Sequence, residues 1–173
     1  MITDSAASRV VPVSPILSEA GVYAEGMLAG AVGAAAIALW FLAIDNIQGH
    51  PFYTPTVLGT VIFGGPPTVD GGAVVPSFET VVSFTWIHAL VFLLIGMGAA
   101  KLLDLAEHNP NLGFGVILLF VLFQCGFLGL SMILADEALH ALAWPTVMGG
   151  NLVAAAAMAR VLWRRHPHLV IEP

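Results

Sequence analysis

Four long apolar runs, each without a formal charge, constrain this sequence more than any other feature. A helix must cross roughly 30 Å of hydrocarbon, which takes about 20 apolar residues at a rise of about 1.5 Å per residue. The four runs are Met27–Ile44, Thr80–Ala100, Leu112–Ala135 and Ala138–Ala159. They are continuously apolar, so they lack the alternation that is typical of a barrel strand. The sequence therefore predicts an all-α integral membrane protein built as a bundle of four transmembrane helices.

These spans form a single predicted domain over residues 21–165. The first twenty residues lack the charged start and short apolar core of a secretory signal, so we expect residues 1–20 to be a retained tail. Residues 166–173 form a second tail, and residues 47–77 form the only sizeable loop. The expected spans, in chain order, are about 24–46, 78–104, 111–135 and 138–164.

Composition excludes several classes of function. Only 9% of the 173 residues are charged, whereas a soluble domain has about 25% because charged side chains cover its wet surface. This argues against a cytosolic enzyme and a disordered tail. The net charge of −6 offers no basic stripe for a phosphate backbone, so we expect no nucleic-acid partner. Cys125 is the single cysteine, which excludes an intramolecular disulfide framework.

The positive charges predict the orientation in the membrane. All five cationic residues precede the first span, separate the second span from the third, or end the fourth; they are Arg9, Lys101, Arg160, Arg164 and Arg165. The two other connections contain no Lys or Arg. Because basic residues collect on the cytoplasmic side, we expect both termini in the cytoplasm and the loop 47–77 outside.

The external loop contains the pattern of one short helix. Thr54 offers a capping hydroxyl, and Pro55 suits the first helical position. An apolar stretch follows, and the residues Gly64 to Pro67 end it. We expect an interfacial helix, too short to span, that lies on the outer leaflet or is tucked into the bundle.

Small residues mark the predicted helix contacts. In lipid, association of helices depends on close backbone approach and on interhelical hydrogen bonds, because apolar contact alone has little advantage over acyl chains. The candidate packing glycines are Gly26, Gly30, Gly33, Gly96, Gly149 and Gly150. The third span instead carries bulky residues around its circumference, and such a surface suits contact with lipid or with a partner subunit.

Other polar and aromatic groups have structural interpretations. Lys101 and Asp104 are three residues apart on one helix and are expected to pair at the surface. Asp45 and Gln124 are interpreted as isolated polar groups. The tryptophans lie where interfacial anchors do; they are Trp40, Trp86, Trp144 and Trp163.

His88 is the one ionisable residue that the predicted boundaries place well inside a span. It lies about 13 Å from the outer end of its helix at 1.5 Å per residue. One interpretation is a neutral histidine that hydrogen bonds to Asn151 or Gln124 of a neighbouring span. The other is a ligand to haem or to the magnesium of a bacteriochlorophyll, because ionisable groups inside a membrane often have a function. The expectation is that no cofactor is bound, and His88 is the candidate if one is.

A second candidate site lies on the outer side. Asp136 and His140 are four residues apart, and Glu137 and His140 three apart, so these side chains share a helix face. With His50 from the external loop they could bind copper, zinc or iron. The alternative is that Asp136 and Glu137 only complement the positive amino end of their helix and meet water.

Three stretches carry a resemblance to known proteins. They are the segment 49–55 followed by Leu58 and Gly59, the pattern Phe84-Thr85-Trp86-Ile87-His88, and the ending 162–167. Together they resemble a group of small four-span bacterial inner-membrane proteins to which no activity is assigned. The resemblance implies a bacterial inner membrane and a four-helix architecture, and it transfers no site residue.

The sequence therefore predicts a protein that is not an enzyme. The leading hypothesis is an accessory subunit that packs, among lipids and other membrane subunits, against a larger energy-transducing complex of the respiratory oxidase or photosynthetic reaction-centre type. The competing hypothesis is a small haem-, chlorophyll- or metal-binding protein that uses His88 or the external group of Asp136, Glu137 and His140.

Overall fold

The computed structural model of the chain describes residues 15–64, 69–70, 73–108 and 144–165. Helices dominate these residues, together with a hairpin of two very short strands. The elements are α1 (Pro15–Ile47), α2 (Tyr53–Phe63), β1 (Val69–Asp70), β2 (Ala73–Val74), α3 (Phe78–His108) and α6 (Trp144–Arg165). The strands are antiparallel, with Val69 opposite Val74. The prediction of a helical protein is confirmed.

Three of the described helices are long and apolar enough to cross a membrane. The qualifying stretches are Glu19–Ile47 of α1, Phe78–Ala106 of α3 and Pro145–Arg164 of α6. They correspond to the first, second and fourth predicted spans. The third predicted span, 111–135, lies outside the described residues, as does the beginning of the fourth.

Two helices extend beyond the ends of the predicted spans. Helix α1 begins at Pro15, although the span was expected from about residue 24 and a tail over residues 1–20. The physical reason is that apolar length sets only the part of a helix that lies in lipid, while a helix can continue into water. Proline suits a first helical turn because its missing N–H has no partner there in any case. Helix α3 likewise continues to His108 rather than to about 104.

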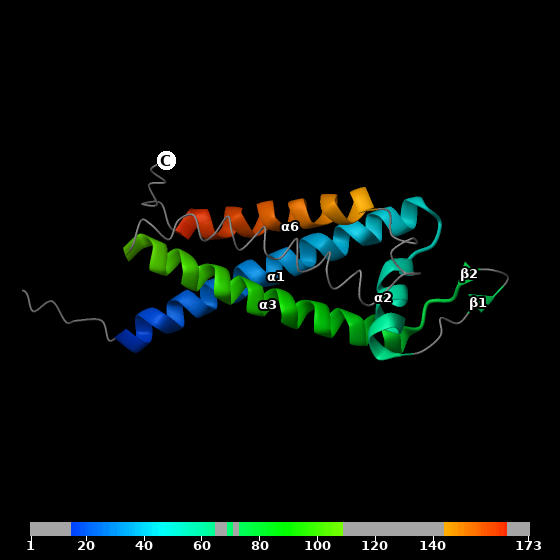
Figure 1. Ribbon diagram of the computed structural model, residues 1–173, viewed down its shortest axis with the longest axis horizontal. Helices are drawn as coiled ribbons and strands as arrows, with labels where there is room; N and C mark the ends of the chain where they lie inside the picture. The colour runs from blue at the N-terminus through cyan, green and yellow to red at the C-terminus, as the bar shows by residue number, and fades with distance from the viewer. Residues whose placement is uncertain (1–14, 65–68, 71–72, 109–143, 166–173) are drawn as a thin grey trace, which may run out of the picture.

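Helix α1 is the central element of the bundle. It packs against α3 along one side and against α6 along another. Figure 1 shows these three helices running along the long axis, with α2 and the strand hairpin at one end. The first turn of α1 and the last turns of α3 and α6 lie at the opposite end.

The contact between α1 and α3 is backbone against backbone. A Cβ atom on Gly26 would lie 2.5 Å from the Cα of Met97. A Cβ on Gly96 would overlap the carbonyl oxygen of Gly26, and one on Gly30 would overlap the carbonyl oxygen of Phe92. Backbone atoms cannot rotate away as a side chain can, so only glycine fits at these three positions.

The contact between α1 and α6 joins small residues to large ones. A Cβ on Gly33 would lie 2.6 Å from the Sδ of Met158, and Cβ atoms on Gly149 and Gly150 would each lie 2.9 Å from the Trp40 ring. The Trp40 Nε1–H also donates a hydrogen bond of 2.9 Å to the Thr146 carbonyl. Trp40 is therefore a half-buried packing residue, because the two glycines of α6 leave space for its ring. Its role as an interfacial anchor stays a prediction.

Helix α2 is a short helix at the end of the bundle. It has 11 residues, about 16 Å at 1.5 Å each, so it cannot span. A Cβ on Gly59 would lie 2.5 Å from the Thr80 Cγ2. Because Gly59 has no Cβ, α2 can pack closely against the beginning of α3. Gly64 ends the helix in the left-handed region, with a φ of 76°, and its N–H donates to the Thr60 carbonyl.

We predict that Gly96→Ala destabilises the protein by about 1–3 kcal/mol, because the added methyl overlaps a backbone carbonyl that cannot yield. Gly98 is the matched control, since it lies two residues along the same helix and a Cβ added there would have no described neighbour within 4 Å. Gly98→Ala should be neutral or up to about 1 kcal/mol stabilising through helix propensity. Thermal unfolding in detergent measures both. Equal effects of the two substitutions would contradict the packing described.

Candidate functional site

His88 lies on α3 in a column of aromatic rings. Its ring is stacked on Phe92 one turn further along the helix, with centroids 4.8 Å apart and planes at 15°. Phe84, one turn before it, is tilted against the other side at 5.8 Å. The side chain is half-buried. Four-residue spacing places these three rings on one face of the helix.

The Nε2 atom of His88 is buried and has no hydrogen-bond partner among the described residues. The expected hydrogen bond to Asn151 is therefore not made by this atom, and Gln124 lies outside the described residues. Nε2 is a suitable donor atom for haem iron or chlorophyll magnesium. It is fully covered, however, so a macrocycle could reach it only after the atoms over it moved. The imidazole of His88 is chemically able to ligate a metal, but in this structure its Nε2 atom is not accessible to a macrocycle.

The buried side chain of Asp45, near the end of α1, hydrogen bonds to the first turn of α2. Only 2% of Asp45 is exposed. Its Oδ2 accepts a 2.8 Å hydrogen bond from the Thr54 N–H, and its Oδ1 accepts a 2.7 Å hydrogen bond from the Thr54 hydroxyl. The carboxylate thus satisfies a donor in the first turn of α2 and complements the positive end of that helix.

The contact between Asp45 and Thr54 shows that two interpretations of the sequence were wrong. Asp45 is not an isolated polar group, and the Thr54 hydroxyl does not cap α2 but donates to Asp45. The helix begins one residue before Thr54, and Phe52 precedes it in the left-handed region, with a φ of 64°. The physical reason is tertiary: the turn after α1 brings a stronger acceptor, a carboxylate, to the amino end of α2.

The external metal site is only partly within the described residues. Asp136, Glu137 and His140 lie outside them. His50 is exposed, and its ring centroid lies 6.4 Å from that of Tyr53. Within residues 15–64, 69–70, 73–108 and 144–165, no group of three or more His, Cys, Asp or Glu side chains could hold a metal ion. His50 is therefore not brought to a described ligand set.

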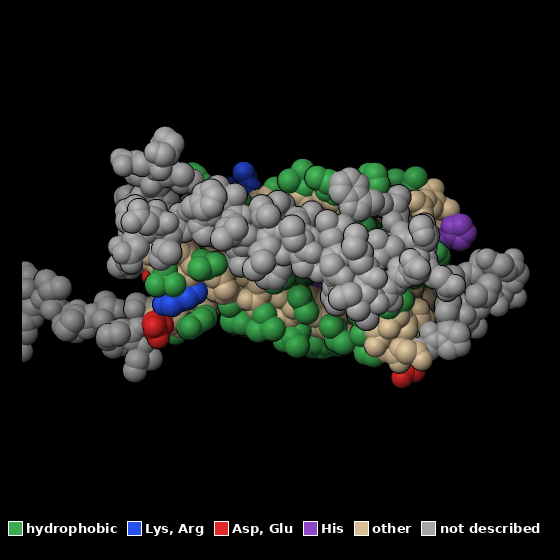
Figure 2. Space-filling model, in the orientation of Figure 1, with side chains coloured by type: hydrophobic (Ala, Val, Ile, Leu, Met, Phe, Trp, Pro, Cys, Tyr) green, Lys and Arg blue, Asp and Glu red, His purple; other side chains and the backbone are tan. Residues whose placement is uncertain are grey.

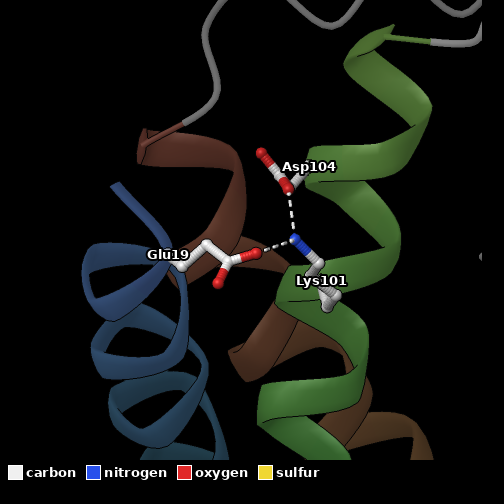
Figure 3. Close-up of polar contacts among 3 residues, drawn as sticks. All are labelled: Glu19, Lys101 and Asp104. Atoms are coloured by element: carbon white, nitrogen blue, oxygen red, sulfur yellow. Dashed lines mark hydrogen bonds and ion pairs between the residues drawn. The ribbon is translucent and has the colours of Figure 1, made fainter. Parts of the chain in front are cut away.

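The other end of the bundle carries an ion cluster between α1 and α3. Figure 3 shows Lys101 pointing toward Asp104 on its own helix and Glu19 on α1. The Lys101 Nζ lies 3.0 Å from the Asp104 Oδ2 and 3.7 Å from the Glu19 Oε1. The predicted pair of Lys101 and Asp104 is confirmed. The contact with Glu19 was not predicted, because residue 19 was assigned to a tail.

Sequence reasoning also passed over Glu25, which the predicted boundaries placed at a span end. In the structure it is half-buried and lies well within α1. The signal that could have found it is Pro15, which suits a helix start and so lengthens α1 on the amino-terminal side.

No protein-family model, curated protein or solved structure matches this chain. The site must therefore be interpreted from its own geometry.

We predict that Asp45→Ala weakens the attachment of α2 by about 0.5–2 kcal/mol, because the Thr54 N–H loses its acceptor. Amide hydrogen exchange at residues 54, 56 and 57 should become about 2- to 30-fold faster, which is the same free energy expressed as a rate ratio. Asn46→Ala is the matched control, since Asn46 is the exposed neighbour and its side chain donates to the Leu42 carbonyl of its own helix. Unchanged exchange in Asp45→Ala would show that the carboxylate does not hold α2.

Proposed function

We propose that this protein is a non-catalytic accessory subunit of a larger energy-transducing complex in a bacterial inner membrane, of the respiratory oxidase or photosynthetic reaction-centre type. Its role would be to stabilise that complex through helix packing. The observation that carries the proposal is a row of large apolar residues that stays exposed along α3.

Among the described residues, α3 has a packed face and a row of exposed apolar residues. Gly96, Ala99 and Ala100 are buried, and Gly96 contacts α1 directly. The exposed row has large apolar residues at four-residue intervals and winds around the helix, so that its last two members lie furthest from Gly96; they are Phe78, Val82, Trp86, Leu90 and Leu94. Only 6% of the most apolar window of α3 is buried, against 28% for α1 and for α6. Figure 2 shows hydrophobic side chains along the long sides of the described bundle.

This stripe supports a packing role because it contains the features of a helix contact. Trp86 is 74% exposed, and large aromatic side chains dominate contact energetics where they are covered. The four-residue spacing forms a ridge that fits the groove of a neighbouring helix. A partner subunit would cover this ridge, whereas α1 and α6 leave it open.

Four of the described ionisable residues have structural contacts, which supports a non-catalytic role. Lys101 pairs with Asp104 and Glu19, and Asp45 holds the first turn of α2. Each of these groups has a structural task at one end of the bundle. His88 is flanked by Phe84 and Phe92 rather than by an acid or a base.

The proposed orientation has both termini in the cytoplasm. The described cations with placed side chains, Lys101, Arg160 and Arg164, belong to the last turns of α3 and α6, at the same end as the beginning of α1. Helix α2 and the strand hairpin lie at the other end. This asymmetry is what the preference of Lys and Arg for the cytoplasmic side predicts.

The alternative is a small haem-, chlorophyll- or metal-binding protein. The buried Nε2 of His88, without a hydrogen-bond partner among the described residues, is the observation that favours it. Such an atom is costly in lipid unless something binds it. The external residues Asp136, Glu137 and His140 stay a candidate metal set on the sequence alone.

Purification of the intact protein from native membranes in mild detergent distinguishes the two functions. We expect other membrane subunits to co-purify, and the double variant Leu90→Ala, Leu94→Ala to reduce their yield at least fivefold. The control is Leu152→Ala with Val153→Ala, two exposed residues of α6, which should leave the yield unchanged. A stable protein without any partner would contradict the accessory role. A haem or chlorophyll band that His88→Phe abolishes would establish the alternative.

Cysteine accessibility in whole cells tests the orientation. In a Cys125→Ser background, we expect Asp70→Cys to react with a membrane-impermeant maleimide and Arg164→Cys to react only after the membrane is opened. The reverse pattern of labelling would overturn the orientation.

A further inference from the structure

A shallow, open groove lies on the surface of α6 near its carboxyl end. Ala159, Arg160, Trp163 and Arg164 line it, and its volume is about 330 Å³. Ala159 and Trp163 are four residues apart, as are Arg160 and Arg164, so the four side chains share one side of the helix. The groove thus has an apolar edge and a basic edge.

The two arginines carry charge that no described residue neutralises. Arg160 and Arg164 are exposed, and the described ion pairs at this end involve Lys101 with Glu19 and Asp104. Two like charges four residues apart on a helix repel each other. An anion between them would remove this repulsion. The groove is therefore suited to a negatively charged ligand.

The position of the groove indicates the source of that anion. The described part of α6 carries no charged residue before Arg160, and arginines at the end of an apolar span lie where the helix leaves the hydrocarbon. Trp163 is 58% exposed, and tryptophan favours the level of the lipid headgroups. Phosphate groups of lipids lie at this same level.

We propose that this groove binds the headgroup of an anionic phospholipid. The guanidinium groups of Arg160 and Arg164 donate to phosphate oxygens, a geometry that the planar guanidinium fork favours. The indole of Trp163 and the methyl of Ala159 contact the glycerol and the first methylenes. The inference depends on α6 crossing the membrane and does not depend on the accessory role.

Native mass spectrometry of the full chain tests the proposal, with phosphatidylglycerol and phosphatidylcholine as the probes. We expect preferential retention of phosphatidylglycerol. Arg160→Gln should weaken it about fivefold, and the double variant with Arg164→Gln roughly 25-fold, the scale for basic residues at an anionic surface. Arg160→Lys with Arg164→Lys should lose part of the preference, because the charge stays while the fork is lost. Unfolding temperatures confirm that each variant is folded.

Lys101→Gln is the matched control, since it removes one positive charge from the same end outside the groove. It should change retention less than twofold. If Lys101→Gln and Arg160→Gln weaken retention equally, the attraction is a general surface charge and the proposed site is overturned. Equal retention of the two lipids, or displacement of phosphatidylglycerol by millimolar inorganic phosphate, would overturn it as well.

Discussion

The close approach of the α1 and α3 backbones is the constraint on which the rest of this structure depends. In lipid, exchanging acyl chains for another helix gains little, so helices associate where their backbones can come near enough for many van der Waals contacts. Gly26, Gly30 and Gly96 permit this, since a methyl group at any of them would overlap backbone atoms of the other helix. The approach fixes α1 as the central helix, and its other side then holds α6 through Trp40 and the Thr146 carbonyl.

Polar contacts at the two ends of the bundle add to the packing that the glycines permit. At one end the buried carboxylate of Asp45 accepts hydrogen bonds from the first turn of α2. The close contact between Gly59 and Thr80 packs that helix against α3. At the other end Lys101 joins α3 to Glu19 of α1. Two exposed surfaces of the described residues have definite chemistry. One is the apolar ridge along α3, and the other is the basic groove of α6.

The sequence predicts the helices well because the cost of an unsatisfied backbone in lipid leaves few alternatives for a long apolar run. It predicts less where a contact depends on tertiary position. Thr54 has the local pattern of a cap, but the carboxylate of Asp45, nine residues earlier, replaces that role. Trp40 matches an interfacial anchor in its position along the span, yet two glycines on a helix more than 100 residues later accommodate its ring. The external set around His140 stays a prediction, because it lies outside the described residues.

Site-specific photo-crosslinking in intact cells tests whether the exposed apolar ridge of α3 packs against another membrane subunit, as proposed. A photoreactive phenylalanine at Leu90 samples the ridge, and one at Leu39 samples an exposed position of α1. We expect a discrete protein crosslink from Leu90 and only lipid adducts from Leu39. Lipid adducts alone from both positions would contradict it, because the ridge would then face the bilayer.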